Sequence, residues 1–125
     1  MTENLQVLMS KAQVHMEGTR AYVSLEKIVP HPLFHVRDPS AAKISELAEN
    51  IRTIGRVINP VQCRPLKGDL GRFELLSGWR RYHAVKQLGW KEIPFDLVDV
   101  DDRAAMLMIL SENFSRKDLT PIEEA

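Results

Sequence analysis

Three prolines set the strongest constraint on how this chain can fold. They stand at positions 30, 32 and 39. Proline fixes φ and removes a backbone N–H donor, so the segment 30–39 can form neither a regular helix nor a central strand. Regular structure must therefore lie on either side of a loop.

The segment after this loop has the periodicity of an amphipathic helix. Its apolar side chains recur every three or four residues, and we expect this face to pack: Ile44, Leu47, Ala48, Ile51 and Ile54. Asp38 or Ser40 can cap the first turn, and Gly55 supplies the C′ residue that ends a helix. The sequence therefore predicts a helix that ends just before Gly55.

The rest of the chain alternates between strand-like and helix-like patterns. Strands are predicted at 21–25, 61–64, 72–77 and 93–98, and helices at 79–88 and about 102–114. Pro94 places the start of its strand, or a sheet edge, at that residue. Residues 1–20 show some helical spacing, but Gly18 and Thr19 interrupt it. We therefore expect a flexible N-terminal tail over 1–20.

Charge and composition limit the functions that remain open. Across 125 residues, 17 basic side chains balance 17 acidic ones, so wholesale coating of nucleic acid is disfavoured and any anion site must be local. No apolar run approaches the roughly 20 residues that span a bilayer, and the first residues lack a secretory signal, which predicts a cytoplasmic protein. The single cysteine, Cys63, permits no internal disulfide.

The junction between the strand at 72–77 and the helix at 79–88 is suited to an anion. A helix N-terminus presents unpaired N–H groups and a partial positive charge. Gly78 allows an anion to approach the backbone, and the guanidinium groups of Arg80 and Arg81 add bidentate donors for phosphate oxygens. This pattern predicts a phosphate-binding turn.

A second polar cluster ends the last predicted helix. Glu112 and Asn113 place a carboxylate beside an amide, and such hard oxygen ligands suit a phosphate-bound Mg²⁺. Arg116, one turn further on, can reach the same phosphates.

Both clusters also have an ordinary explanation. The two arginines could be solvated, or could pair with Glu46 or Glu74. Glu112 and Arg116 could form a surface pair at i, i+4. The residues alone leave these alternatives open.

Taken together, the segments from Tyr22 onward resemble the N-terminal domain of the ParB family, the centromere-binding proteins of bacterial chromosome and plasmid partition. The resemblance rests on several boxes in order: the opening strand, the Pro-rich loop with Arg37, the helix 44–51 leading to Gly55, Asn59-Pro60-Val61, Gly78-Trp79-Arg80-Arg81-Tyr82-His83-Ala84, and residues 112–125. It implies an α+β fold over residues 21–125, with a small mixed sheet and packed helices as in sulfiredoxins. It also implies that the domain binds CTP with Mg²⁺.

The resemblance also implies roles for individual residues. It places the following residues at the nucleotide: Arg37, Ser77, Gly78, Trp79, Arg80, Arg81, Glu112, Asn113 and Arg116. Within this set, Gly78, Arg80 and Arg81 would hold the triphosphate, and Glu112 and Asn113 would lie at the metal.

For the parent protein, the resemblance implies a nucleotide-gated clamp. In the family, CTP lets two such domains engage as a dimer that slides on DNA, and slow CTP hydrolysis reopens it. The helix-turn-helix reader and the dimerisation domain would lie beyond this chain, in which a capping box at 120–123 begins a further helix. The segment 1–20 occupies the place where many relatives contact a ParA-type ATPase. The protein would act in the cytoplasm, on the nucleoid or a plasmid.

The sequence departs from the usual box at two positions. Trp79 stands where most relatives have Glu, and His83 where many have Arg. The missing carboxylate could impair hydrolysis without preventing binding, and the indole could stack on a base or pack against the sheet. Two alternatives to a CTPase clamp remain, a ParB-like nuclease and a non-enzymatic interaction module. A sulfiredoxin-like reductase is disfavoured, because Cys63 lies outside the phosphate-binding turn.

Overall fold

A computed structural model describes the backbone of residues 2–31, 41–69 and 71–117, and the side chains of 7–31, 43–69 and 71–111. The elements in chain order are α1 (Thr2–Ala12), β1 (His15–Glu17), β2 (Arg20–Ser24), η1 (Leu25–Lys27), β3 (Ile28–Pro30), α2 (Ala41–Ile54), β4 (Val61–Pro65), β5 (Phe73–Ser77), α3 (Trp79–Leu88), β6 (Glu92–Leu97) and α4 (Asp102–Lys117). This arrangement confirms the predicted α+β class.

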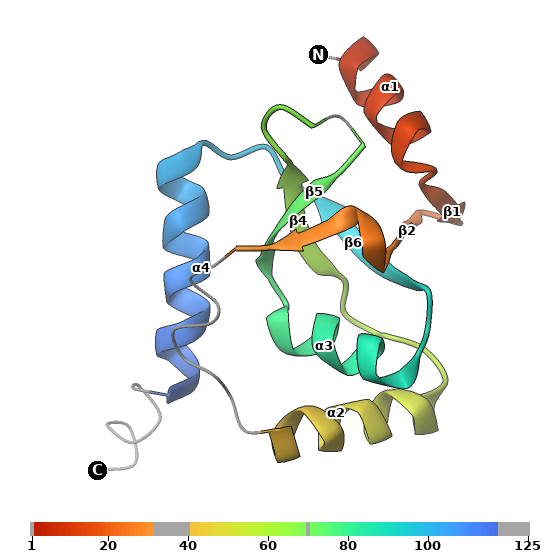
Figure 1. Cartoon of the computed structure of the whole chain (residues 1–125), viewed down its shortest axis with the longest axis vertical. Helices are drawn as coiled ribbons and strands as arrows, with labels where there is room; N and C mark the ends of the chain where they lie inside the picture. Colours follow the sequence, from red (N-terminus) through yellow and green to blue (C-terminus); the bar gives the residue numbers. More distant parts are fainter. Residues whose placement is uncertain (1, 32–40, 70, 118–125) are drawn as a thin grey trace.

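The strands form one mixed sheet in the order β1-β2-β6-β4-β5-β3. β1 with β2, β2 with β6, and β4 with β5 run antiparallel, whereas β4 with β6 and β3 with β5 run parallel. The fully buried rings of Phe73 and Phe95 meet at the centre of this sheet with centroids 5.0 Å apart. Figure 1 shows α2 and α3 side by side at one end of the sheet and α1 at the other.

The strand that contains Pro94 lies inside the sheet rather than at its edge. Pro94 pairs with Tyr22 of β2, but pairing with β4 begins only at Phe95. At Pro94, β6 therefore has a partner strand on one side only, which tolerates a residue without an N–H. The prediction of a sheet edge was therefore wrong for β6 as a whole, but it describes the pairing at Pro94 itself.

Helices α2 and α3 pack on each other and have the predicted limits. Gly55, at φ 94°, ends α2, and Gly89, at φ 80°, ends α3. Of the predicted core residues of α2, Ala48 and Ile51 are buried and Ile44 and Leu47 are partly buried, whereas Ile54 is 56% exposed. At about 100° per residue, Ile54 lies about 80° round the helix from Ile44, at the fringe of the packed stripe.

The segment expected to be a flexible tail forms α1 and β1. Leu8 and Ala12 are buried in the core, and a Cβ added to Gly71 would lie 3.2 Å from the Cβ of Lys11, so α1 packs closely on the β4–β5 connection. The interruption at Gly18 is the turn of the β1–β2 hairpin. Local pattern could not reveal this packing, because its other half comes from residues about 60 positions away.

The last helix is anchored at its N-terminus by charged groups. The Asp101 carboxylate accepts a hydrogen bond of 2.8 Å from the Ala104 N–H. Asp102 forms ion pairs with Lys67 at 2.8 Å and Arg64 at 3.0 Å, which tie α4 to β4 and its following loop. Of the helices in the described ranges, none is long and apolar enough to cross a membrane.

Candidate functional site

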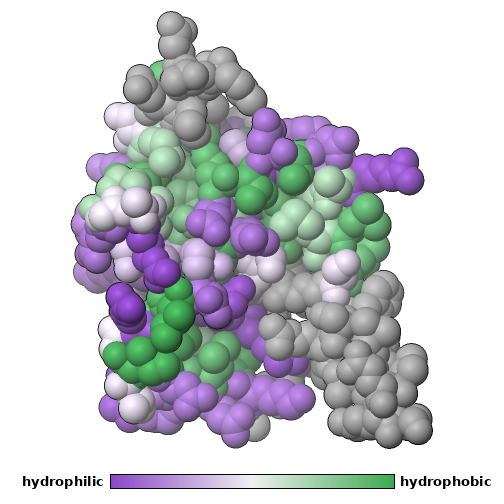
Figure 2. All heavy atoms as spheres, turned by 180° about the vertical axis from the view of Figure 1, so that it is seen from behind, coloured by the Kyte–Doolittle hydropathy of each residue, from purple (hydrophilic) through white to green (hydrophobic). Residues whose placement is uncertain are grey.

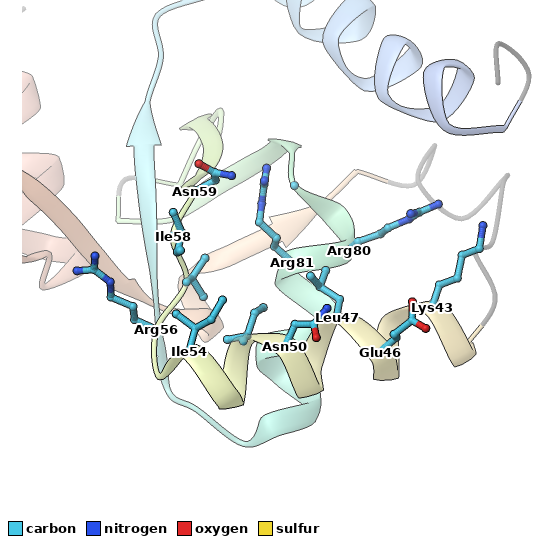
Figure 3. A pocket seen from close by; sticks show the side chains of 13 residues that line it. Lys43, Glu46, Leu47, Asn50, Ile54, Arg56, Ile58, Asn59, Arg80 and Arg81 are labelled. Atoms are coloured by element: carbon cyan, nitrogen blue, oxygen red, sulfur yellow. The ribbon is translucent and has the colours of Figure 1, made fainter. Parts of the chain in front are cut away.

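Helix α2, the segment after it and the N-terminus of α3 enclose a cavity of about 510 Å³ (Figure 3). Residues 56–59, in the segment between α2 and β4, form one wall. Gly78, Arg80 and Arg81 contribute the opposite wall, and α2 forms the floor between them. Three stretches that are distant in sequence thus converge on one cavity.

Gly78 is the N-cap of α3 and adopts a left-handed conformation, with φ 98° and ψ 27°. Its carbonyl accepts the first helical hydrogen bond, from Tyr82 N–H at 2.9 Å. A Cβ here would lie 2.6 Å from Cγ1 of Val61, a fully buried residue of β4. Glycine is therefore required here by its backbone conformation and by close packing. Both requirements are separate from the access for an anion that the sequence indicates.

The charge in this cavity is predominantly positive. Lys43, Arg56, Arg80 and Arg81 line it, against the single carboxylate of Glu46 among the described lining residues. The N-terminus of α3 adds the positive end of its helix dipole. A chain with no net charge thus concentrates cationic groups in one place, as a local anion site requires.

The two carboxylates that could have neutralised the arginines lie in different places. Glu74 accepts a hydrogen bond of 2.8 Å from Nε of Arg64, and both side chains are only about 15% exposed. Glu46 lies in the cavity itself.

The residues predicted for the site are brought together in part. Gly78, Arg80 and Arg81 line the cavity. Ser77 ends β5 and pairs with Gln62 of β4. Trp79 is 6% exposed and belongs to the core, where its ring lies 4.5 Å from that of His83. The indole thus packs in the core, one of the two roles considered for it.

The side chains of the other predicted residues lie outside the described ranges. Arg37 lies outside the described residues. Glu112, Asn113 and Arg116 fall on the last two turns of α4, where the structure describes the backbone. Their proximity to the cavity stays a prediction.

The floor of the cavity was missed by the sequence argument. Lys43, Leu47, Asn50 and Ile54 all line it from α2. Their spacing of i, i+4, i+7 and i+11 is a helical stripe beside the buried one. The sequence contains this signal, but its mixture of polar and apolar residues gives no reason to single it out.

Cys63 is fully buried in β4. Its burial, with a smaller contribution from Asp96, raises the pKa of the thiol above its ordinary value. A thiol that stays protonated is a poor nucleophile. Among the residues whose side chains are described, no cluster of three or more His, Cys, Asp or Glu could hold a metal ion.

Comparison with known sequences identifies the family. The ParB N-terminal domain family matches residues 9–114. A nucleoid occlusion protein of Geobacillus thermodenitrificans is 47% identical over 83 residues, which cover 66% of this chain and 28% of that protein. A probable chromosome-partitioning protein ParB of Vibrio cholerae is 36% identical over 123 residues, or 98% of this chain and 41% of that one. The chain thus spans less than half the length of these relatives.

Solved structures agree with this result. The C-terminally truncated chromosome-partitioning protein ParB of Caulobacter crescentus, complexed with CTP-γ-S, matches with a TM-score of 0.68 and 28% identity over 86% of this chain and 59% of that one. The same protein complexed to the centromeric parS site matches at 0.66, with 23% identity over 78% and 48%, a likeness of fold alone. Sulfiredoxin of Arabidopsis thaliana matches at 0.59 with 26% identity, over 73% of this chain and 97% of that one, as expected for the predicted fold.

The family match extends from α1 into α4 and includes every element that builds the cavity. The chain belongs to the ParB N-terminal domain family.

Proposed function

We propose that this domain binds CTP, with the triphosphate at the N-terminus of α3 and the rest of the nucleotide along α2. The observation that carries the proposal is the convergence of Gly78, Arg80 and Arg81 on one cavity. Backbone N–H groups at a helix start and two forked guanidinium groups match the oxygens of a polyphosphate.

The cavity suits a nucleotide better than an isolated phosphate. Its volume of about 510 Å³ lies in the range of small-molecule sites. Beyond the arginines, the exposed side chains of Ile54 and Ile58 supply apolar surface for the face of a base. Asn50 and Asn59 add amide groups that can donate and accept hydrogen bonds. Figure 2 shows that hydrophobic and hydrophilic surface also alternate over the rear face of the molecule.

Mg²⁺ would accompany the nucleotide and neutralise part of the phosphate charge. Its proposed protein ligands are Glu112 and Asn113 of α4, with Arg116 and Arg37 near the same phosphates. Mg²⁺ characteristically takes one or two protein oxygens and completes its shell with phosphate and water, so a small ligand set is adequate.

For the whole protein we propose nucleotide-gated engagement of two such domains around DNA. The family membership, and the CTP-γ-S in the C. crescentus relative, support this proposal. Reading of a specific DNA site would belong to a domain outside this chain. Slow CTP hydrolysis would release the engaged state, and a ParA-type ATPase would bind at the N-terminal segment.

The test is calorimetric titration of the domain with CTP, UTP, ATP and GTP, each with and without Mg²⁺. We expect Mg²⁺-dependent binding that is tightest for CTP. Arg81→Ala should abolish it, because one of the two guanidinium groups at the start of α3 is lost. Arg52→Ala is the matched control, since this exposed arginine of α2 pairs with Glu49 and does not line the cavity.

Two results would contradict the proposal. The first is no heat of CTP binding to the original chain at protein concentrations that detect a micromolar dissociation constant. The second is an equal loss of binding in the Arg81 and Arg52 variants. Release of inorganic phosphate, measured separately, reports hydrolysis.

A role in nucleoid occlusion is the second candidate for the parent protein, because the Geobacillus relative with that name is 47% identical. Deletion of the gene distinguishes the roles. Loss of partition should give cells without chromosomes, whereas loss of nucleoid occlusion should give division septa across nucleoids.

A further inference from the structure

Arg20, the first residue of β2, contacts a wall of the cavity from outside it. Its Nη1 donates to the carbonyl oxygen of Val57 at 2.7 Å, and its Nη2 donates to that of Ile58 at 2.7 Å. Both carbonyls lie 37 or 38 positions further along the chain. One guanidinium thus binds two consecutive peptide groups of the segment between α2 and β4.

That segment shapes the cavity. Val57, Ile58 and Asn59 all line it, but their residues belong to neither a helix nor a strand. Val57 is buried at 4% exposure and pins one end, whereas Ile58 is 49% exposed. The peptide groups near Ile58 therefore depend on contacts such as those from Arg20 to keep their orientation.

The chemistry of arginine suits this task. Its planar fork presents two parallel N–H donors, so it can hold two neighbouring carbonyls at once. A lysine ammonium is a point charge and would reach one carbonyl well. The two short, charge-assisted bonds fix the distance and the orientation of the wall relative to β2.

We propose that Arg20 is a positioning residue for the ligand cavity, which holds residues 57–59 in the conformation that binds nucleotide and links them to the β1–β2 hairpin. The inference rests on the proposed function for its ligand. Arg20 does not line the cavity and acts through the backbone that it holds.

The link has a consequence for the N-terminal segment. In the hairpin Arg20 lies opposite Glu17 of β1 in the strand register, and two residues separate the end of α1 from the start of β1. Because coupling free energies are reciprocal, a change in the hairpin that moves Arg20 alters nucleotide affinity, and bound nucleotide stabilises the hairpin by the same amount.

The experiment compares Arg20→Met, Arg20→Lys and Arg72→Met in the 125-residue chain. Arg72 is the matched control, because it also donates to a backbone carbonyl, that of Glu26 at 3.5 Å, and does not line the cavity. Nitrogen-15 relaxation measures the backbone order of residues 57–59, calorimetry measures CTP affinity, and thermal unfolding measures stability.

For Arg20→Met we expect order parameters at 57–59 to fall from about 0.85 towards 0.6. CTP affinity should fall about tenfold, which corresponds to about 1.4 kcal/mol. Arg20→Lys should lie between this variant and the original chain, because it keeps the charge and can donate to one of the two carbonyls. Arg72→Met should match the original chain in the backbone order of residues 57–59 and in CTP affinity.

Unchanged order at 57–59 in Arg20→Met, or CTP affinity within twofold of the original, overturns the inference. If Arg20→Met does not fold, the same criteria apply to Arg20→Lys. If the original chain binds no nucleotide, the proposed function fails, and the relaxation data decide the positioning role separately. In that case, a loss of order confined to 57–59 supports it and no loss refutes it.

Discussion

Replacement of Gly78 by alanine tests whether the turn at the start of α3 is built as the structure shows. The new Cβ would lie 2.6 Å from Cγ1 and 3.0 Å from Cβ of Val61, closer than carbon atoms can approach without a shift. Val61 is fully buried in β4, which has a partner strand on each side, so relief by movement is costly. The left-handed φ of 98° adds strain of its own for any residue with a Cβ.

The two contributions can be estimated separately. The left-handed conformation costs an L-residue about 1–2 kcal/mol. Forcing an extra methyl group into a packed core costs about 1–3 kcal/mol more. Gly78→Ala should therefore destabilise the domain by about 2–5 kcal/mol, which lowers the melting temperature by roughly 10–20 °C.

Two comparisons separate these contributions. Gly89→Ala introduces a Cβ at φ 80° with nothing within 4 Å, so it should show the conformational strain alone. In a Val61→Ala background, the closest contact of the new methyl disappears. The cost of Gly78→Ala should then fall by about 1–3 kcal/mol in a double-mutant cycle. Denaturation by urea, followed by circular dichroism, measures all four variants.

A cost of Gly78→Ala no greater than that of Gly89→Ala, or additive effects of the Gly78 and Val61 changes, would show that no steric conflict exists at this turn. The new methyl would also lie 3.1 Å from Nη2 of Arg81. We therefore expect weaker CTP binding by Gly78→Ala at temperatures where the variant is still folded.

Two further predictions concern the ion pairs of Arg64 and Asp102. Arg64→Ala leaves the largely buried Glu74 carboxylate without its 2.8 Å partner. It should lower the free energy of unfolding by about 2–4 kcal/mol, measured by chemical denaturation. Arg52→Ala removes an exposed ion pair and should leave stability almost unchanged, so equal effects of the two variants would refute this prediction. Hydrogen bonds and charge from Lys67, then Arg64, hold the pKa of Asp102 below its ordinary value. The stabilisation is therefore present above the ordinary pKa and is lost as the pH falls through the lowered one. Asp102→Asn should lose less stability than the original chain on acidification below about pH 5, and parallel pH curves would contradict this.

Much of the fold is specified by local signals. Gly55 and Gly89 end α2 and α3 where predicted, because a left-handed residue satisfies the last helical carbonyls at little cost to glycine. The strands β2, β4, β5 and β6 lie within one residue of their predicted bounds. The order of these strands was not predictable, since it depends on long-range pairing rather than on the pattern within each strand.

The site divides in the same way. The turn at Gly78 is a local arrangement of a strand end, a glycine and a helix start, so its residues could be named from the sequence. The opposite wall, residues 56–59, reaches the cavity only because α2 packs on α3. Arg20 contacts that wall from the first residue of β2, a position that no pattern near it marks as functional.

Trp79 and His83 show how helix geometry decides which residues of a motif can touch a ligand. Positions i and i+4 lie on the same face of a helix, and these two rings are in contact there. Arg80 and Arg81 follow Trp79 by about 100° and 200° and line the cavity from another side. Trp79 and His83, the two expected departures from the usual ParB box, thus fall together on one face, whereas Arg80 and Arg81 lie on another. A change at positions 79 and 83 therefore alters how α3 packs, and leaves in place the guanidinium groups proposed to hold the triphosphate.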